Sequence, residues 1–123
     1  MNDLSEFKLP AAAASDEGWC VYLLLCCGGA LYCGISNRPA ERFAAHQSGK
    51  GAKYTRIRKP LEMRLLFHRL SRSAATKQEV AIKKLKTADK QELWEQAERL
   101  VIEQDTGGDL YKNTFRVQRL IDQ

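Results

Sequence analysis

Long apolar runs are missing from this sequence of 123 residues, although 44% of its residues are hydrophobic. Val21–Leu25 is too short to cross a bilayer, since a membrane-spanning helix needs about 20 apolar residues. The N-terminus carries Asp3 and Glu6 where a signal peptide would have a basic start followed by an apolar stretch. We therefore predict a cytoplasmic protein that has no membrane partner.

Cysteine pairs typical of zinc sites are also missing. The four cysteines follow the spacing C-x5-C-C-x5-C, whereas structural zinc sites typically use C-x2-C pairs. Disulfides are not expected either, because thiols stay reduced inside the cell. We interpret Cys20, Cys26, Cys27 and Cys33 as small residues of the core.

Negative charge is scarce in the middle of the chain. Between Arg38 and Lys90, fifteen lysines and arginines stand against four acidic residues, which gives this segment a net charge of +11. The whole chain carries +5, so the remaining residues carry −6. Concentrated positive charge favours a polyanionic partner, nucleic acid first, but a solvated basic surface would give the same count.

Two apolar segments flank a Gly-Gly turn and predict a β-hairpin. Trp19–Cys26 is rich in aromatic and branched residues, and its near-continuous apolar character predicts a strand that is covered on both faces. Ala30–Ile35 is the predicted return strand. Gly28 and Gly29 supply the positive φ angles that hairpin turns need.

The length of the hairpin loop decides how its two tyrosines are placed. A three-residue loop would pair Tyr22 with Gly34 and Leu24 with Tyr32, which puts both tyrosines on one face as diagonal neighbours. A two-residue loop would put the tyrosines on opposite faces. A shared site requires the first register, in which Gly34 would have a structural role by leaving room above the Tyr22 ring for a substrate backbone.

The rest of the chain predicts a small α/β domain with a three-stranded, mostly antiparallel sheet flanked by helices. The predicted elements are a helix that starts with a capping side chain in Ser36-Asn37-Arg38-Pro39 and runs to about Gln47, a strand over Leu61–Leu70, a helix capped by Ser71 or Ser73 that reaches about Lys86, and a helix over roughly Ala88–Gln104. Leu110–Gln123 fits a helix or a last strand. We expect a flexible tail over residues 1–18, a domain over 19–94, and a C-terminal helical extension over 95–123 that packs on it.

Three polar side chains stand out on the predicted helices. Arg42 and His46 are four residues apart and share a helix face, while Phe43 and Ala44 point elsewhere and can pack. Glu79 falls at the edge of a buried face, where a carboxylate needs an arginine, a lysine or a metal ion. Plainer interpretations are a surface cation, a surface histidine, and a Glu79 paired with its i+4 neighbour; the tyrosines could likewise be ordinary half-buried strand residues.

Gly49–Pro60 predicts a basic loop that interleaves an aromatic residue with cations, a combination suited to phosphates and unstacked bases. The second predicted helix adds further lysines on its basic side. The candidate nucleic-acid-binding residues are Lys50, Lys53, Tyr54, Arg56, Arg58, Lys83 and Lys84.

Three segments together resemble the GIY-YIG nuclease superfamily, in particular its small, single-domain bacterial branch of proteins similar to YhbQ. They are VYL…LYCGIS, RPAERFAAHQSGKGAKYTR and QEVAIKKL, and the resemblance covers about Trp19–Leu93. Val21-Tyr22-Leu23 stands for GIY, and Tyr32-Cys33-Gly34 stands for YIG.

The resemblance implies a role for each candidate residue. Tyr22 would act as the general base or position the attacking water, and Tyr32 would orient the water or the scissile phosphate. Arg42 would hold the phosphate and stabilise the transition state, and His46 would assist proton movement or bind phosphate. Glu79 would bind one Mg²⁺ or Mn²⁺ ion that stabilises the leaving 3′ oxygen.

The implied activity is hydrolysis of DNA phosphodiester bonds that leaves a 5′-phosphate, in DNA repair or recombination on branched or damaged structures. RNA stays open as a substrate. The alternative is a nucleic-acid-binding module that kept the fold with little or no catalysis. We expect a monomer or weak dimer whose specificity comes from the basic segment or from a protein partner.

Overall fold

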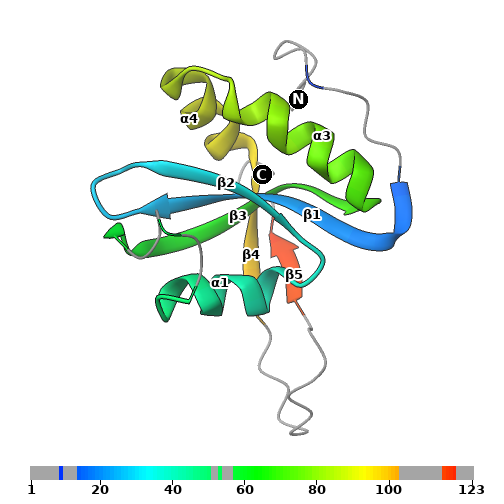
Figure 1. The fold of residues 1–123 in the computed structure, drawn as a ribbon, viewed down its shortest axis with the longest axis horizontal. Helices are drawn as coiled ribbons and strands as arrows, with labels where there is room; N and C mark the ends of the chain where they lie inside the picture. The colour runs from blue at the N-terminus through cyan, green and yellow to red at the C-terminus, as the bar shows by residue number, and fades with distance from the viewer. Residues whose placement is uncertain (1–8, 10–13, 51–52, 54–56, 103–114, 119–123) are drawn as a thin grey trace, which may run out of the picture.

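A computed structural model describes residues 9, 14–50, 53, 57–102 and 115–118 of the chain. In these ranges, five antiparallel strands form one sheet in the order β2-β1-β3-β4-β5 (Figure 1). The strands are β1 (Ala14–Cys26), β2 (Leu31–Ser36), β3 (Pro60–Leu70), β4 (Glu98–Ile102) and β5 (Phe115–Gln118). The helices are α1 (Pro39–Gln47), α3 (Arg72–Lys83) and α4 (Thr87–Gln96).

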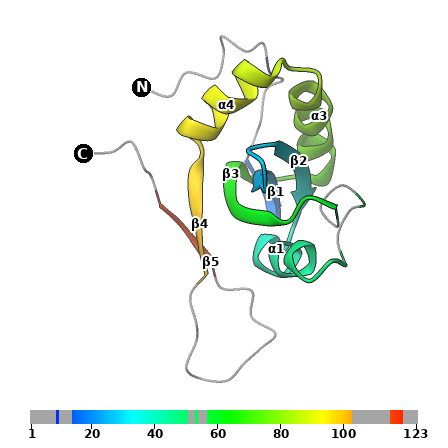
Figure 2. The ribbon, with the colours of Figure 1, turned by 90° about the vertical axis from the view of Figure 1, so that its left-hand side faces the viewer.

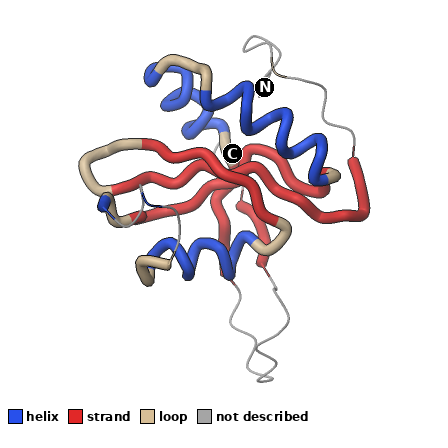
Figure 3. Tube along the Cα trace, in the orientation of Figure 1, coloured by secondary structure: helices blue, strands red, loops and turns tan. Residues whose placement is uncertain are grey.

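Strand β1 runs through the sheet and buries side chains on both faces. Tyr22 and Leu24 point to one face, Val21 and Leu23 point to the other, and none of the four is more than 1% exposed. Helix α1 covers the first face through Phe43, whereas α3 and α4 cover the second (Figures 1 and 3). Figure 2 shows α1 and α3 on opposite sides of β1, β2 and β3. The prediction that this strand is covered on both faces is confirmed.

The predicted fold class is confirmed, but the predicted number of strands is wrong. The helix expected over Ala88–Gln104 ends at Gln96, and the chain continues as β4, which pairs with β3. Strand β5 lies on the outer side of β4, so the described part of Leu110–Gln123 is a strand. The helical extension predicted for residues 95–123 is therefore wrong for Glu98–Ile102 and Phe115–Gln118, which form strands.

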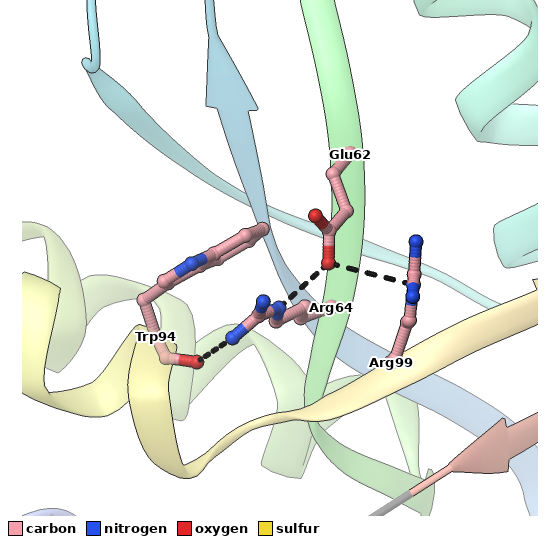
Figure 4. A network of polar contacts seen from close by, with 4 residues as sticks. All are labelled: Glu62, Arg64, Trp94 and Arg99. Carbon is pink, nitrogen blue, oxygen red and sulfur yellow. Dashed lines mark hydrogen bonds and ion pairs between the residues drawn. The ribbon is translucent and has the colours of Figure 1, made fainter. Parts of the chain in front are cut away.

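A network of polar contacts marks the point where α4 ends (Figure 4). The Arg64 guanidinium donates hydrogen bonds to the Trp94 carbonyl oxygen at 3.0 Å and to a Glu62 carboxylate oxygen at 2.7 Å. It also lies 4.1 Å from the centroid of the Trp94 ring, and Arg99 of β4 approaches the same Glu62 oxygen at 3.8 Å. Because the last carbonyls of a helix lack donors within the helix, this contact stabilises the end of α4 where β4 begins.

Several predicted boundaries and contacts need correction. The predicted tail is wrong for residues 14–18, which belong to β1; Leu9 packs against the core, and residues 1–8 and 10–13 lie outside the described residues. Cys20, Cys26 and Cys33 are buried as predicted, but Cys27 is exposed in the hairpin turn. No helix in the described part of the chain is long and apolar enough to cross a membrane.

The predicted helix starts are confirmed in one case and corrected in the other. The Ser71 hydroxyl accepts a hydrogen bond from the Ala74 N–H at 3.0 Å and caps α3, which ends at Lys83 rather than at Lys86. Helix α1 has Arg38 at its N-cap, with no side-chain hydrogen bond to cap it. The Ser36 hydroxyl instead accepts a hydrogen bond from the Arg38 N–H at 2.9 Å, in a turn that precedes the helix.

Candidate active site

The hairpin adopts the register that places both tyrosines on one face. The Cys26 N–H donates to the Ala30 carbonyl oxygen at 2.8 Å, which closes a three-residue loop. Tyr22 pairs with Gly34, and Tyr32 lies opposite Leu24. The φ angles of +88° and +86° at the two loop glycines explain why this turn needs them. The alternative with the tyrosines on opposite faces is therefore excluded.

Gly34 provides space for Tyr22 itself rather than for a substrate. A Cβ atom built on Gly34 would collide with the Tyr22 hydroxyl and lie 2.5 Å from Cζ of the ring. The Tyr22 ring therefore lies across the glycine backbone, and the expected room for a substrate backbone is taken. This contact fixes the ring, since an exposed fraction of 1% leaves it no alternative position in solvent.

His46 lies between the two tyrosines. Its Nε2 atom is 2.9 Å from the Tyr22 hydroxyl, and its ring packs edge-on against both Tyr22 and Tyr32, with centroids 5.9 Å and 5.7 Å apart. His46 is fully buried under α1, so the interpretation as a surface histidine is wrong. Tyr22 is likewise buried rather than half-buried, whereas Tyr32 is half-buried.

The prediction that Phe43 and Ala44 of α1 pack is confirmed for one residue and wrong for the other. Phe43 packs against the core cluster that contains Tyr22, whereas Ala44 is exposed. Arg42 is half-buried and lies on the same side of the helix as His46, one turn earlier. Three residues of one short helix therefore face the hairpin: an arginine, a phenylalanine and a histidine.

Burial keeps the tyrosine and the histidine neutral at physiological pH. Burial raises the pKa of Tyr22 to about 12, although the nearby Arg42 guanidinium partly opposes the shift. Burial and, to a lesser degree, the Arg42 charge lower the pKa of His46 to about 4. A neutral phenol is therefore hydrogen-bonded to a neutral imidazole, and neither group carries a charge at physiological pH.

The low pKa of His46 predicts that the protein loses stability in mild acid. In the unfolded chain the imidazole takes up a proton near pH 6.5, whereas the folded protein resists it down to about pH 4. The free energy of unfolding should therefore fall by about 3 kcal/mol between these pH values and show no further loss from this group below them. Urea unfolding of the wild type and His46→Gln at pH 7, 5.5 and 4 measures this.

Because carboxylates also titrate in that range, the difference between the two proteins isolates the histidine. The pH dependence of wild type should exceed that of His46→Gln by the stated amount. Equal slopes would show that the histidine takes up its proton without resistance from the fold.

A pocket of about 300 Å³ opens where β2 leads into α1, and it shares Arg42 with the surroundings of Tyr22. Its lining residues are Ser36, Asn37, Arg38, Glu41, Arg42 and Ala45. Sequence reasoning missed Arg38, although it lies four residues before Arg42 and so shares its helix face. The Arg38 guanidinium is paired with the Glu41 carboxylate at 3.5 Å, but the two side chains are 65% and 49% exposed, so this ion pair is weak.

Glu79 is paired with a lysine, which is one of the cations that its position required. Its carboxylate is 3.6 Å from the Lys83 ammonium, and that ammonium is 5.6 Å from the centroid of the Tyr32 ring. Burial raises the pKa of the Cys33 thiol to about 12, and the Glu79, Lys83 and Lys90 charges also act on it. Glu79 therefore lies near Cys33 of β2, on the α3 side of the sheet. The Lys83 ammonium lies near both the Glu79 carboxylate and the Tyr32 ring.

The donor set at Glu79 fits a hard divalent cation that keeps most of its water. In the described ranges no three side chains of His, Cys, Asp or Glu type gather as a metal cluster. A single carboxylate is nevertheless a usual way to hold Mg²⁺, which loses its water ligands reluctantly and completes its shell with substrate phosphates. Glu79 is accessible enough for this, since its side chain is 21% exposed.

The candidate nucleic-acid-binding residues that can be placed are exposed. These are Lys50, Lys53, Arg58, Lys83 and Lys84, whereas Tyr54 and Arg56 lie outside the described residues. Lys53 and Ile57 have helical backbone, so the loop predicted over Gly49–Pro60 is wrong at these two positions. The end of this segment lies against the hairpin: the Cys27 N–H donates to the Lys59 carbonyl oxygen at 2.8 Å.

Comparison with known proteins identifies the family. The family model for the GIY-YIG catalytic domain matches residues 18–93. A UPF0213 protein of Neisseria meningitidis serogroup C is 53% identical over 84 residues, which cover 68% of this chain and 92% of that protein. A UPF0213 protein of Cupriavidus pinatubonensis is 51% identical over 75 residues, which cover 61% and 83%. One of Xanthomonas axonopodis pv. citri is 38% identical over 91 residues, which cover 74% and 88%.

No solved structure gives a significant match to the chain. The matched residues 18–93 contain the hairpin, α1, β3, α3 and most of α4, and so they include both tyrosines, His46 and Glu79. Since the family model spans more than half of the sequence, this chain belongs to the GIY-YIG catalytic domain family, a nuclease superfamily.

Proposed function

We propose that this protein is a metal-dependent endonuclease that hydrolyses phosphodiester bonds in DNA. The observation that carries the proposal is the buried Tyr22–His46 pair, which packs against Tyr32 and lies near Arg42, a residue that also lines a pocket. A hydrogen-bonded phenol and imidazole beside a guanidinium unite a proton acceptor with a phosphate ligand. A domain that only packed its core would gain little from burying the phenol and the imidazole together beside a half-buried guanidinium.

Proton transfer in this proposal runs from the attacking water to Tyr22 and on to His46. The pKa of about 12 makes a free tyrosinate rare at neutral pH, so the phenol must release its proton as it accepts one from water. Neutral Nε2 of His46, 2.9 Å away, is placed to receive that proton. The resulting imidazolium lies near Arg42 in a buried site, so it gives its proton back to Tyr22 readily, while Tyr22 passes its own proton to the leaving 3′ oxygen or to water.

Arg42 holds the scissile phosphate in this proposal. Its guanidinium lines the pocket and also lies near the Tyr22 hydroxyl, so one phosphate could contact the arginine while its phosphorus faces the attacking water. The planar fork of donors matches two phosphate oxygens and stabilises the charge that develops on them. Arg38 and Asn37, which also line the pocket, would contact the neighbouring nucleotide.

Glu79 is the proposed metal ligand, and a bound Mg²⁺ or Mn²⁺ ion would supply stabilisation of the leaving 3′ oxygen. Lys50, Lys53, Lys84 and Arg58 would bind the flanking backbone, which fits a net charge of +11 between Arg38 and Lys90. We propose branched or damaged DNA as the substrate and DNA repair or recombination as the setting. A protein partner would supply further specificity.

A cleavage assay tests this function directly. We expect the wild type to cut at least one of a panel of single-stranded, duplex, flapped and branched DNA substrates with Mg²⁺, and to cut none with EDTA. Glu79→Gln should lower the rate about 100-fold or more, because several kcal/mol of charge stabilisation are lost. Glu95→Gln makes the same change at an exposed position of α4 and should leave the rate unchanged.

One observation favours a second candidate function, a nucleic-acid-binding module without appreciable catalysis. The Glu79 carboxylate is already paired with Lys83, as in a helix that uses the glutamate only for an i,i+4 ion pair. This candidate predicts salt-dependent DNA binding with no cleavage of any substrate in the panel. Cutting that persists in Glu79→Gln would show that Glu79 is not the metal ligand.

A further inference from the structure

The Lys83 ammonium lies near two groups of the proposed catalytic set. It is 3.6 Å from a Glu79 carboxylate oxygen and 5.6 Å from the centroid of the Tyr32 ring. A metal ion bound to Glu79 would compete with the Lys83 ammonium for the carboxylate, and the positive charge of the ion would repel the ammonium at this short distance.

We propose that Lys83 is a placeholder for the divalent cation: it neutralises Glu79 in the metal-free protein and moves onto a substrate phosphate when the cation binds. The inference rests on the proposed function in so far as Glu79 is the metal ligand. It assigns to Lys83 a positioning role that differs from general attraction of DNA, because its two partners alternate.

The exposure of the pair makes such an exchange feasible. The Lys83 side chain is 48% exposed and the Glu79 side chain 21% exposed, so water screens the ion pair and a dication can displace the lysine at small cost. Lys83 is also the last residue of α3, and its four-carbon stem can swing without disturbing a following helical turn. A buried, rigid ion pair would instead exclude the metal.

The placeholder has a reason in the local charges. Glu79 lies at the rim of the core, and its charge acts on the buried Cys33 thiol. A half-buried carboxylate without a cation is unfavourable, so the metal-free protein gains from a lysine that keeps it neutralised. When the metal takes over that task, the released ammonium adds a charge where the phosphate charge develops.

Metal binding without DNA tests the first half of the proposal. Free Mn²⁺ is measured by electron paramagnetic resonance in titrations of wild type, Lys83→Met and Lys77→Met. Lys77 is exposed on the same helix and lies two residues from Glu79, about 200° around the axis, so the control matches the charge change. We expect Lys83→Met to bind Mn²⁺ about fivefold more tightly than wild type, and Lys77→Met to stay within about twofold.

The release of Lys83 onto phosphate is tested by DNA affinity with and without a metal. In EDTA, Lys83→Met should bind DNA as wild type does, because the lysine is held by Glu79. With Ca²⁺ in place of Mg²⁺, the same variant should bind about threefold more weakly than wild type. Lys77→Met should show the same small change in both conditions.

Two results would overturn the proposal. One is Mn²⁺ affinity in Lys83→Met equal to or weaker than in wild type, including no detectable binding in either protein. The other is a loss of DNA affinity that is the same with and without the metal, which makes Lys83 an ordinary phosphate contact. Lys83→Gln repeats both measurements with a polar side chain in case methionine disturbs the fold. Metal binding by a protein that cuts no DNA would refute the proposed function alone.

Discussion

Tyr22→Phe should reduce the rate of DNA cleavage about 1,000-fold, because it removes the hydroxyl that accepts the proton of the attacking water. Phenylalanine keeps the ring that packs on Gly34 and fills the core, so the variant should stay folded. It loses the hydrogen bond to His46, which should lower the free energy of unfolding by only about 1 kcal/mol. Cleavage under single-turnover conditions and urea unfolding measure the two effects separately.

The relay to His46 gives this prediction a sharper form. If Tyr22 and His46 act as one unit, the double variant Tyr22→Phe/His46→Gln should be about as slow as Tyr22→Phe alone. Without the Tyr22 hydroxyl, no proton reaches His46, so its removal should cost nothing further. Multiplied losses would show that the histidine acts elsewhere, for example on the phosphate. Tyr111→Phe makes the same change outside the residues that the family model matches, and it should cut as wild type does.

The local features of the site could be predicted from the sequence because short-range geometry determines them. A Gly-Gly turn allows few loops, and the three-residue loop places Tyr22 and Tyr32 on one face whereas a two-residue loop does not. The four-residue spacing of Arg42 and His46 likewise fixed a shared helix face. Whether that face met the sheet or the solvent could not be decided, because it depends on how α1 crosses the hairpin. The burial of His46 is a tertiary property of this kind.

The errors in the C-terminal third have a similar cause. Leu93, Ala97 and Leu100 fit a helical period, so nothing local marks the end of α4 before β4 begins. The break follows from contacts with β3: Arg64 binds the Trp94 carbonyl, and β3 offers β4 a partner for its backbone. A sequence pattern cannot show an unpaired strand edge in another part of the chain, so tertiary pairing overrides the helical pattern here.

Gly34→Ala should destabilise the domain by about 3 kcal/mol and abolish cleavage, because a methyl group at this position would overlap the Tyr22 ring. The effect is steric, since Gly34 is not among the glycines with positive φ. The atoms that collide are Oη, Cζ and Cε1 of the tyrosine, and all three are absent from leucine. In a Tyr22→Leu background the same alanine should therefore cost less than about 1 kcal/mol.

Urea unfolding of wild type, Gly34→Ala, Tyr22→Leu and the double variant forms the cycle that tests this explanation. A coupling of about 2 kcal/mol or more between the two sites would mean that the glycine exists to admit the tyrosine. An equal cost in both backgrounds would place the clash elsewhere on the hairpin. If the coupling is found, Gly34 of the second motif and Tyr22 of the first form one packing unit. The catalytic hydroxyl is then held in place because the neighbouring strand has no side chain at Gly34.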